Sequence, residues 1–173
     1  MDGRPSRFLS YICELNEDDT LTILYPDKSE TCYFIPPRLG GYPVTRIGQG
    51  AFRSIDILEK VCIPDSVTHI DAYAFAACPN LTDIRIPASV THIGIYAFDS
   101  YGNKTKTVRV DPGSYAERYF SGKRKQFEVV LADPRNPKRQ IRKSTWLAAQ
   151  LLKKIHTSNM LAKLQIQHKR KAP

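Results

Sequence analysis

The sequence lacks most of the features by which catalytic, metal-binding and membrane-spanning proteins are recognised. It has four cysteines, with no CxxC pair and no histidine at metal-ligand spacing, whereas structural zinc sites use such short spacings. No apolar run approaches the roughly 18 residues that a membrane-spanning helix needs. GxSxG, HExxH and phosphate-cradling glycine loops are also absent. These absences predict free thiols, no cofactor and no small-molecule substrate, and they argue against an enzyme.

Acidic residues are confined to the first 133 positions. Residues 1–133 hold 15 Lys or Arg and all 17 Asp or Glu, a net charge of −2 (15 − 17), whereas residues 134–173 hold 11 Lys or Arg and no acid. The N-terminus has no apolar core of the kind that an export signal needs. We therefore expect a near-neutral folded body with a basic tail, in the cytoplasm as the chain stands. A surface or secreted location would follow if the sequence is a fragment of a longer exported protein.

The most specific feature present is a repeated phrase. IPDSVTHIDAYAF, from Ile63, returns 23 residues later as IPASVTHIGIYAF, with ten of thirteen letters unchanged. Three copies begin at Val44, Val67 and Val90, and the third is longer by two residues. A fixed period of this length predicts a solenoid, because a single coil cannot bury its own apolar residues and must stack on its neighbours.

The recurring letters predict which residues form the core and where the chain turns. Apolar side chains recur at four positions of the copies and are expected to form buried ladders: Val44, Val67 and Val90; Ile47, Ile70 and Ile93; Ala51, Ala74 and Ala97; Phe52, Phe75 and Phe98. Ile84 and Ile86 alternate as in a β-strand that Pro87 ends. The isoleucine of each copy is followed directly by Gly48, Asp71 or Gly94. These residue types tolerate a positive φ, so a tight turn is expected there.

These residues closely resemble the BspA-like leucine-rich repeats. The IPxSVTxIGxxAF phrase carries the resemblance, and LTILYPDKSETCYFIPPRLGGYPVTRIG, from Leu21, resembles the N-terminal capping hairpin of that family. GSYAERY, from Gly113, resembles the segment on which such arrays finish, with Phe127 and Val129 in a closing strand. The resemblance implies a β-rich α/β solenoid of 23-residue coils. It places a leucine-rich-repeat domain at 1–131 (cap 8–43, repeats 44–114, C-terminal cap 115–131). The resemblance does not extend to 132–173, where the two prolines of DPRNPKRQ, from Asp133, and the helical spacing beyond them predict a linker with a basic helical tail.

The strand alternation predicts a grid of side chains on the outer face of the repeat strands, made of Lys60, Cys62, Asp83, Arg85, Thr107 and Arg109. Its mixed charge suits a protein or peptide ligand better than a polyanion. Members of the resembled family are mostly interaction proteins. We therefore predict a non-catalytic protein-protein interaction module, with a partner that the sequence does not identify.

A second set of repeated positions is expected to face outward, as a ladder of Arg46, His69 and His92 beside Tyr73 and Tyr96. Two stacked imidazoles could hold a metal, but a third ligand is missing and Arg46 would repel the cation, so no metal site is predicted. For the tyrosines, stacked packing and an exposed contact patch are the two alternatives. Ser66 and Ser89 also recur, and we expect their hydroxyls to bond turn backbone.

The basic tail has three alternative roles. Ile141, Thr145, Ala148, Leu152 and Ile155 follow helical spacing, so this stretch could pack on the open end of the array. It could instead bind an anionic membrane or an acidic partner, or bind nucleic acid through phosphate contacts. The cations available for such contacts include Lys138, Arg139, Arg142, Lys143, Lys153 and Lys154. A tail-driven binder of nucleic acid or anionic membrane is thus the alternative function.

Overall fold

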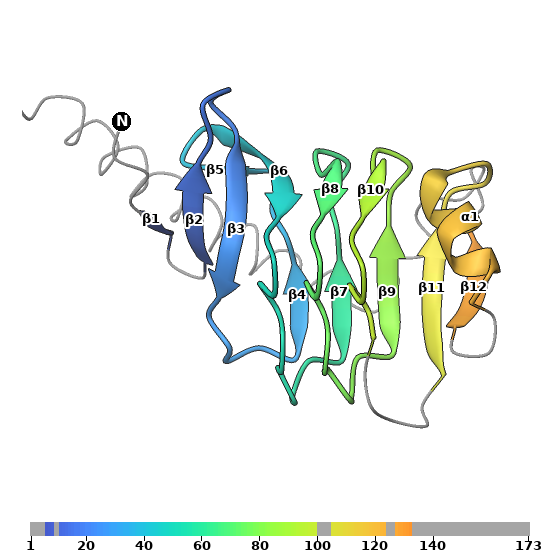
Figure 1. Cartoon of the computed structure of the whole chain (residues 1–173). Helices are drawn as coiled ribbons and strands as arrows, with labels where there is room; N and C mark the ends of the chain where they lie inside the picture. Colours follow the sequence, from blue (N-terminus) through green and yellow to red (C-terminus); the bar gives the residue numbers. More distant parts are fainter. Residues whose placement is uncertain (1–5, 9–10, 100–104, 124–126, 133–173) are drawn as a thin grey trace, which may run out of the picture.

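The chain winds into a stack of coils that contribute strands to two sheets (Figure 1). The computed structural model describes residues 6–8, 11–99, 105–123 and 127–132. The first sheet has the order β1 (Ser6–Phe8), β2 (Tyr11–Leu15), β3 (Leu21–Pro26), β6 (Tyr42–Ile47), β8 (His69–Ile70) and β10 (His92–Ile93), with β5 (Arg38–Leu39) paired to β6. The second has the order β12 (Phe127–Leu131), β11 (Lys106–Val110), β9 (Asp83–Ile86), β7 (Lys60–Cys62) and β4 (Cys32–Phe34). The predicted β-rich solenoid of 23-residue coils is confirmed.

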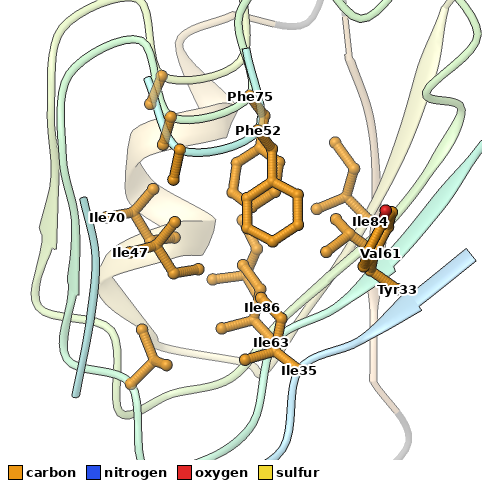
Figure 2. Close-up of a cluster of buried hydrophobic side chains, with 14 of the residues drawn as sticks. Tyr33, Ile35, Ile47, Phe52, Val61, Ile63, Ile70, Phe75, Ile84 and Ile86 are labelled. Atoms are coloured by element: carbon orange, nitrogen blue, oxygen red, sulfur yellow. The ribbon is translucent and has the colours of Figure 1, made fainter. Parts of the chain in front are cut away.

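The core lies between the two sheets and includes the predicted ladders (Figure 2). Phe75 stacks on Phe52 with ring centroids 4.8 Å apart and on Phe98 at 5.2 Å, and all three rings are 0 to 1% exposed. Tyr33 and Phe120 extend this aromatic column edge-on at its two ends. Each buried phenylalanine stabilises the fold by roughly 1.5 to 3 kcal/mol through removal of apolar surface from water.

The strands of the second sheet alternate as predicted. Ile84 and Ile86 are buried, whereas Asp83 and Arg85 between them are partly exposed, and β9 ends directly before Pro87. The strand pairs parallel with β7 on one side and β11 on the other. Equivalent residues of successive coils therefore lie opposite one another, which places outward side chains in straight rows across the sheet.

The predicted turn exists, but its left-handed residue is not where the sequence placed it. Gly48, Asp71 and Gly94 do not have a positive φ; the left-handed residues are two positions later, at Gly50 (φ 63°), Tyr73 (φ 59°) and Tyr96 (φ 55°). Glycine is required at position 94 for a different reason. A Cβ there would collide with the Ala72 backbone of the previous coil, so close approach rather than φ explains the glycine.

Both ends of the array are closed by secondary structure, a hairpin at the N-terminal end and a helix followed by a strand at the other. At the N-terminal end, β2 and β3 form an antiparallel hairpin whose second strand pairs parallel with β6. At the other end the helix α1 (Tyr115–Ser121) is capped by Ser114, whose Oγ accepts the Glu117 amide at 3.1 Å. The strand β12 then pairs with β11. The helical tail predicted at 132–173 lies outside the described residues, apart from Ala132.

Copy three departs from the others in the strand β11. Its side chains follow the in-out alternation of β9, but Lys106 is turned inward and is only 4% exposed. Its Nζ donates a hydrogen bond to the Phe98 carbonyl at 3.0 Å. Burial lowers the pKa of Lys106, because desolvation disfavours the charged ammonium. In the described part of the chain, no helix has the length and apolarity to cross a membrane.

Candidate functional site

The register of the second sheet brings the six predicted grid residues together on one surface. Lys60, Asp83 and Thr107 lie opposite one another in one row, and Cys62, Arg85 and Arg109 do so in the next. All six side chains are partly exposed. We call this surface the outer sheet face, defined by these six residues of β7, β9 and β11.

Asp83 is the electrostatic centre of the outer sheet face. Its Oδ2 forms an ion pair with Nζ of Lys60 at 3.0 Å, and its Oδ1 forms a second ion pair with the Arg109 guanidinium. The Lys60, Asp83 and Arg109 side chains are 32%, 26% and 33% exposed, respectively, so water screens these pairs and each contributes little to stability. Their effect is to hold three long side chains in fixed positions.

Glu128 extends the first row onto β12, where sequence reasoning had assigned only a closing strand. Its Oε2 accepts a hydrogen bond from the Thr107 hydroxyl at 3.4 Å, and the two residues are opposite in the β11 and β12 register. Continuing the strand alternation from β11 into β12 would have predicted this position. Glu128 therefore belongs to the border of the outer sheet face.

Cys62 is the thiol of the outer sheet face. Burial raises the pKa of its thiol, and the positive charges of Lys60, Arg85 and Arg109 oppose that shift. The net direction disfavours the thiolate, so this residue is not an activated nucleophile. The four cysteines are free thiols, with Cys13 and Cys78 fully buried.

The predicted ladder of Arg46, His69 and His92 lies on the outer side of the first sheet. The three residues are opposite one another in β6, β8 and β10, and the two imidazole centroids are 5.7 Å apart. Arg46 is paired with Asp71 at 3.7 Å. The pKa of His69 is lowered, mainly by burial and next by the charge of Arg46. Among the described residues, no group of three or more His, Cys, Asp or Glu has the arrangement of a metal site.

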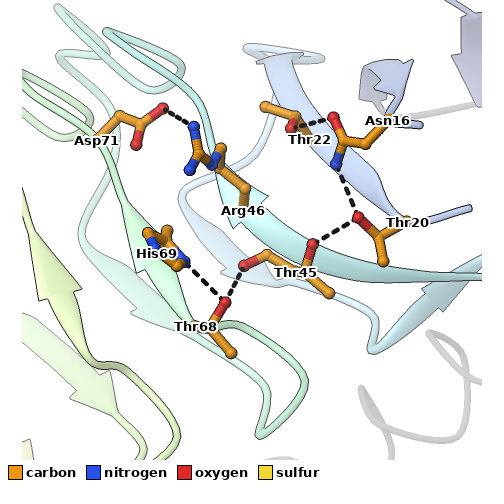
Figure 3. A network of polar contacts seen from close by, with 8 residues as sticks. All are labelled: Asn16, Thr20, Thr22, Thr45, Arg46, Thr68, His69 and Asp71. Atoms are coloured by element: carbon orange, nitrogen blue, oxygen red, sulfur yellow. Dashed lines mark hydrogen bonds and ion pairs between the residues drawn. The ribbon is translucent and has the colours of Figure 1, made fainter. Parts of the chain in front are cut away.

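A threonine column beside this ladder was not predicted, although the second letter of every copy is threonine (Figure 3). The Thr45 hydroxyl donates to the Thr20 hydroxyl at 2.9 Å, and the Thr68 hydroxyl lies 2.8 Å from Nδ1 of His69. Thr68 and Thr91 also donate to the backbone carbonyl of the preceding coil, at 3.3 and 3.4 Å. These bonds connect neighbouring coils, which favours a structural role for the column.

Tyr73 and Tyr96 stack on each other, which is one of the two alternatives that the sequence left open. Their rings stack with centroids 5.4 Å apart, and the Arg53 guanidinium lies 5.6 Å from the Tyr73 ring centroid. Tyr96 is nevertheless 51% exposed, and its neighbour Ile95 is 67% exposed. Both tyrosines adopt the left-handed conformation that Gly50 adopts in copy one, which costs an L-residue roughly 1 to 2 kcal/mol.

The two repeated serines differ in their hydrogen bonds. Ser89 donates its hydroxyl to the Val67 carbonyl of the preceding coil at 2.8 Å, so its partner is a backbone group, as predicted, but in the neighbouring coil. The buried Ser66 Oγ has no hydrogen-bond partner among the described residues, which contradicts the prediction for that position. The six named tail cations, Lys138 to Lys154, lie outside the part of the chain that the structure describes.

Parallel strands stacked at a 23-residue period, with a buried ladder inside and a row of polar side chains outside, define a leucine-rich-repeat solenoid. A family model described as "BspA type Leucine rich repeat region (6 copies)" matches residues 41–125. Residues 41–125 are thus a leucine-rich repeat region of the BspA type, as the sequence had indicated.

Two solved structures are similar to the chain. A leucine-rich repeat protein from Bacteroides capillosus is 27% identical, with a TM-score of 0.46 over 62% of this chain and 98% of that one. The T. pallidum leucine-rich repeat protein is 18% identical, with a TM-score of 0.38 over 61% of this chain and 71% of that one. The search of curated proteins gave no match.

Proposed function

We propose that this protein is a non-catalytic protein-interaction module whose partner binds the outer sheet face. The observation that carries this proposal is the two-row grid on β7, β9 and β11, in which partly exposed polar side chains stand in register over a fully buried layer. Leucine-rich-repeat folds are commonly interaction modules, which supports the same conclusion.

The packing beneath the outer sheet face supports a binding role. Val61, Ile84 and Val108 lie opposite one another directly under the grid, and each is fully buried. A surface fixed in this way loses little conformational freedom when a partner binds, and preorganisation of this kind increases affinity. The Lys60, Asp83 and Arg109 pairs fix the side chains further.

Site-specific photo-crosslinking on the full chain tests the proposal. A photoreactive amino acid at Thr107, on the outer sheet face, is expected to capture a partner from an extract of the source organism. The same group at Thr91 is the matched control, because Thr91 is exposed and lies next to β10 of the other sheet. Capture at position 91 and none at position 107 would refute the assignment of the face.

The second candidate function is binding of nucleic acid or anionic membrane by residues 134–173. The observation that favours it is the count of 11 Lys or Arg and no acid in this segment. Binding through phosphate contacts falls steeply with salt concentration. Replacing Lys153 and Lys154 by glutamine in the full chain should weaken binding to an oligothymidylate or to anionic vesicles under this alternative. It should leave capture at Thr107 unchanged under the first proposal.

A further inference from the structure

We infer that the partner of the outer sheet face presents an acidic segment with apolar flanks, which lies across the strands along the row of Arg85 and Arg109. This inference rests on the proposed function and specifies the chemistry of its ligand. It is carried by three observations: an adjacent arginine pair, an excess of positive charge, and the residues that end the row.

Arg85 and Arg109 stand directly opposite each other on neighbouring parallel strands. Neighbouring strands lie about 4.8 Å apart, and like charges at opposite positions destabilise a sheet. Asp83 relieves only part of this repulsion, because it pairs with Arg109 and Lys60. Among the described residues, Arg85 has no ion-pair partner. A carboxylate placed between the two guanidinium groups would remove the repulsion, and arginine is well suited to bidentate contact with carboxylates.

The charge balance of the face also favours an acidic ligand. Its six outward residues carry three cations and one anion, and Glu128 at its border adds a second anion, so the net charge is +1 (3 − 2). The chain's own tail is an unsuitable occupant, since residues 134–173 carry 11 cations and no acid. A second copy docked face to face would bring two positive surfaces together. A separate partner of opposite charge fits best.

The ends of the arginine row set the flanking chemistry. Phe34 of β4 continues the row beyond Cys62, and Val130 of β12 continues it beyond Arg109. Val130 is 37% exposed, and Phe34 is partly exposed. Five strands span about 19 Å, which an extended segment of roughly six residues covers. The row therefore fits acidic side chains in the middle of such a segment and apolar side chains at its ends.

The test measures binding of a fluorescein-labelled peptide of consecutive glutamates flanked by leucines to the full chain, by fluorescence anisotropy. Arg85→Gln is expected to weaken binding about five- to tenfold. Arg53→Gln is the matched control, because it removes one exposed positive charge from a turn outside the face. The unsubstituted chain and the variants all carry the same basic tail, so any binding of the peptide to the tail does not affect the comparison. Arg85→Lys, which keeps the charge, should restore part of the affinity, and thermal unfolding checks that each variant is folded.

Equal loss in Arg85→Gln and Arg53→Gln would overturn the inference, as would equally tight binding of a peptide with glutamine in place of glutamate. Stronger binding of an oligothymidylate that depends on Arg85 would assign the arginine pair to nucleic acid instead. Self-association of the chain that is lost in Arg85→Gln would assign it to a second copy. If Thr107 captures a partner whose binding does not depend on Arg85, the inference fails while the proposed function stands.

Discussion

Replacing Phe75 with alanine is the sharpest test of how the array is held together. Phe75 is fully buried and lies in the middle of the aromatic column, with rings 4.8 and 5.2 Å away on its two sides. Phe→Ala changes in well-packed cores cost about 3 to 5 kcal/mol, because a cavity adds to the lost burial. We expect a value at the upper end, since the rigid coils on both sides cannot close the gap.

Urea unfolding followed by circular dichroism gives this free energy directly. Tyr25→Ala is the control, because it removes an aromatic ring of similar size from a position that is 55% exposed, and it should cost less than about 1 kcal/mol. Phe75→Leu should fall between the two. Equal stability of Phe75→Ala and Tyr25→Ala would refute the reasoning that the stacked column carries the stability of the array.

Three further predictions follow from the turns and the titrating groups. Gly50→Ala should lower the free energy of unfolding by about 1 to 2 kcal/mol, because alanine is strained at a positive φ. Gly94→Ala should lower it by more, because the added Cβ collides with the backbone of the neighbouring coil. Equal losses in urea unfolding would contradict this prediction. The pKa of His69 is below its ordinary value of about 6.5, so its stabilising contribution is present above that pH and is lost as the pH falls through the lowered pKa. In a plot of the free energy of unfolding against pH, His69→Gln should therefore reduce the loss of stability below about pH 6.5. An unchanged plot would count against the lowered pKa of His69. The pKa of Cys13 is raised to about 12 and its side chain is fully buried, so iodoacetamide at pH 8 should label the partly exposed Cys32 first, as mass spectrometry of the native chain would show.

The sequence predicted the core and the strands well because both depend on periodicity. Phe75 and its equivalents recur at the period of the coil, and burial is what a recurring apolar residue indicates in a solenoid. Ile84 and Ile86 likewise show the two-residue alternation of a strand. These features need no knowledge of the detailed backbone path.

The turns were predicted less well, because residue type alone does not separate two uses of glycine. Gly94 is required by close approach of two coils, whereas Gly50 is required by its φ. Tyr73 then occupies the left-handed position that a tyrosine rarely takes. Only the three-dimensional path of the chain distinguishes these positions.

The sequence predicted which residues of β7, β9 and β11 share one side of the sheet, but not how they interact. Alternation correctly placed Arg85 and Arg109 on one side of the sheet, since the side-chain period of a strand is fixed. The repeat period predicts which positions of neighbouring strands lie opposite each other, but not which charged side chains form ion pairs, so the pairing of Asp83 with both Lys60 and Arg109 could not be foreseen. The sequence predicted β12 only as a closing strand, so it did not place Glu128 at the border of the outer sheet face.

The most direct test of the central claim is the dissociation constant of the partner captured at Thr107, measured by calorimetry on the chain of residues 1–173. Thr107→Trp adds bulk to the outer sheet face, and His92→Trp adds similar bulk to the other sheet, where His92 is exposed. We predict that Thr107→Trp weakens binding by tenfold or more, about 1.4 kcal/mol, and that His92→Trp does not change it. Unchanged binding by Thr107→Trp, with a loss on replacing Lys153 and Lys154 by glutamine, would contradict the account.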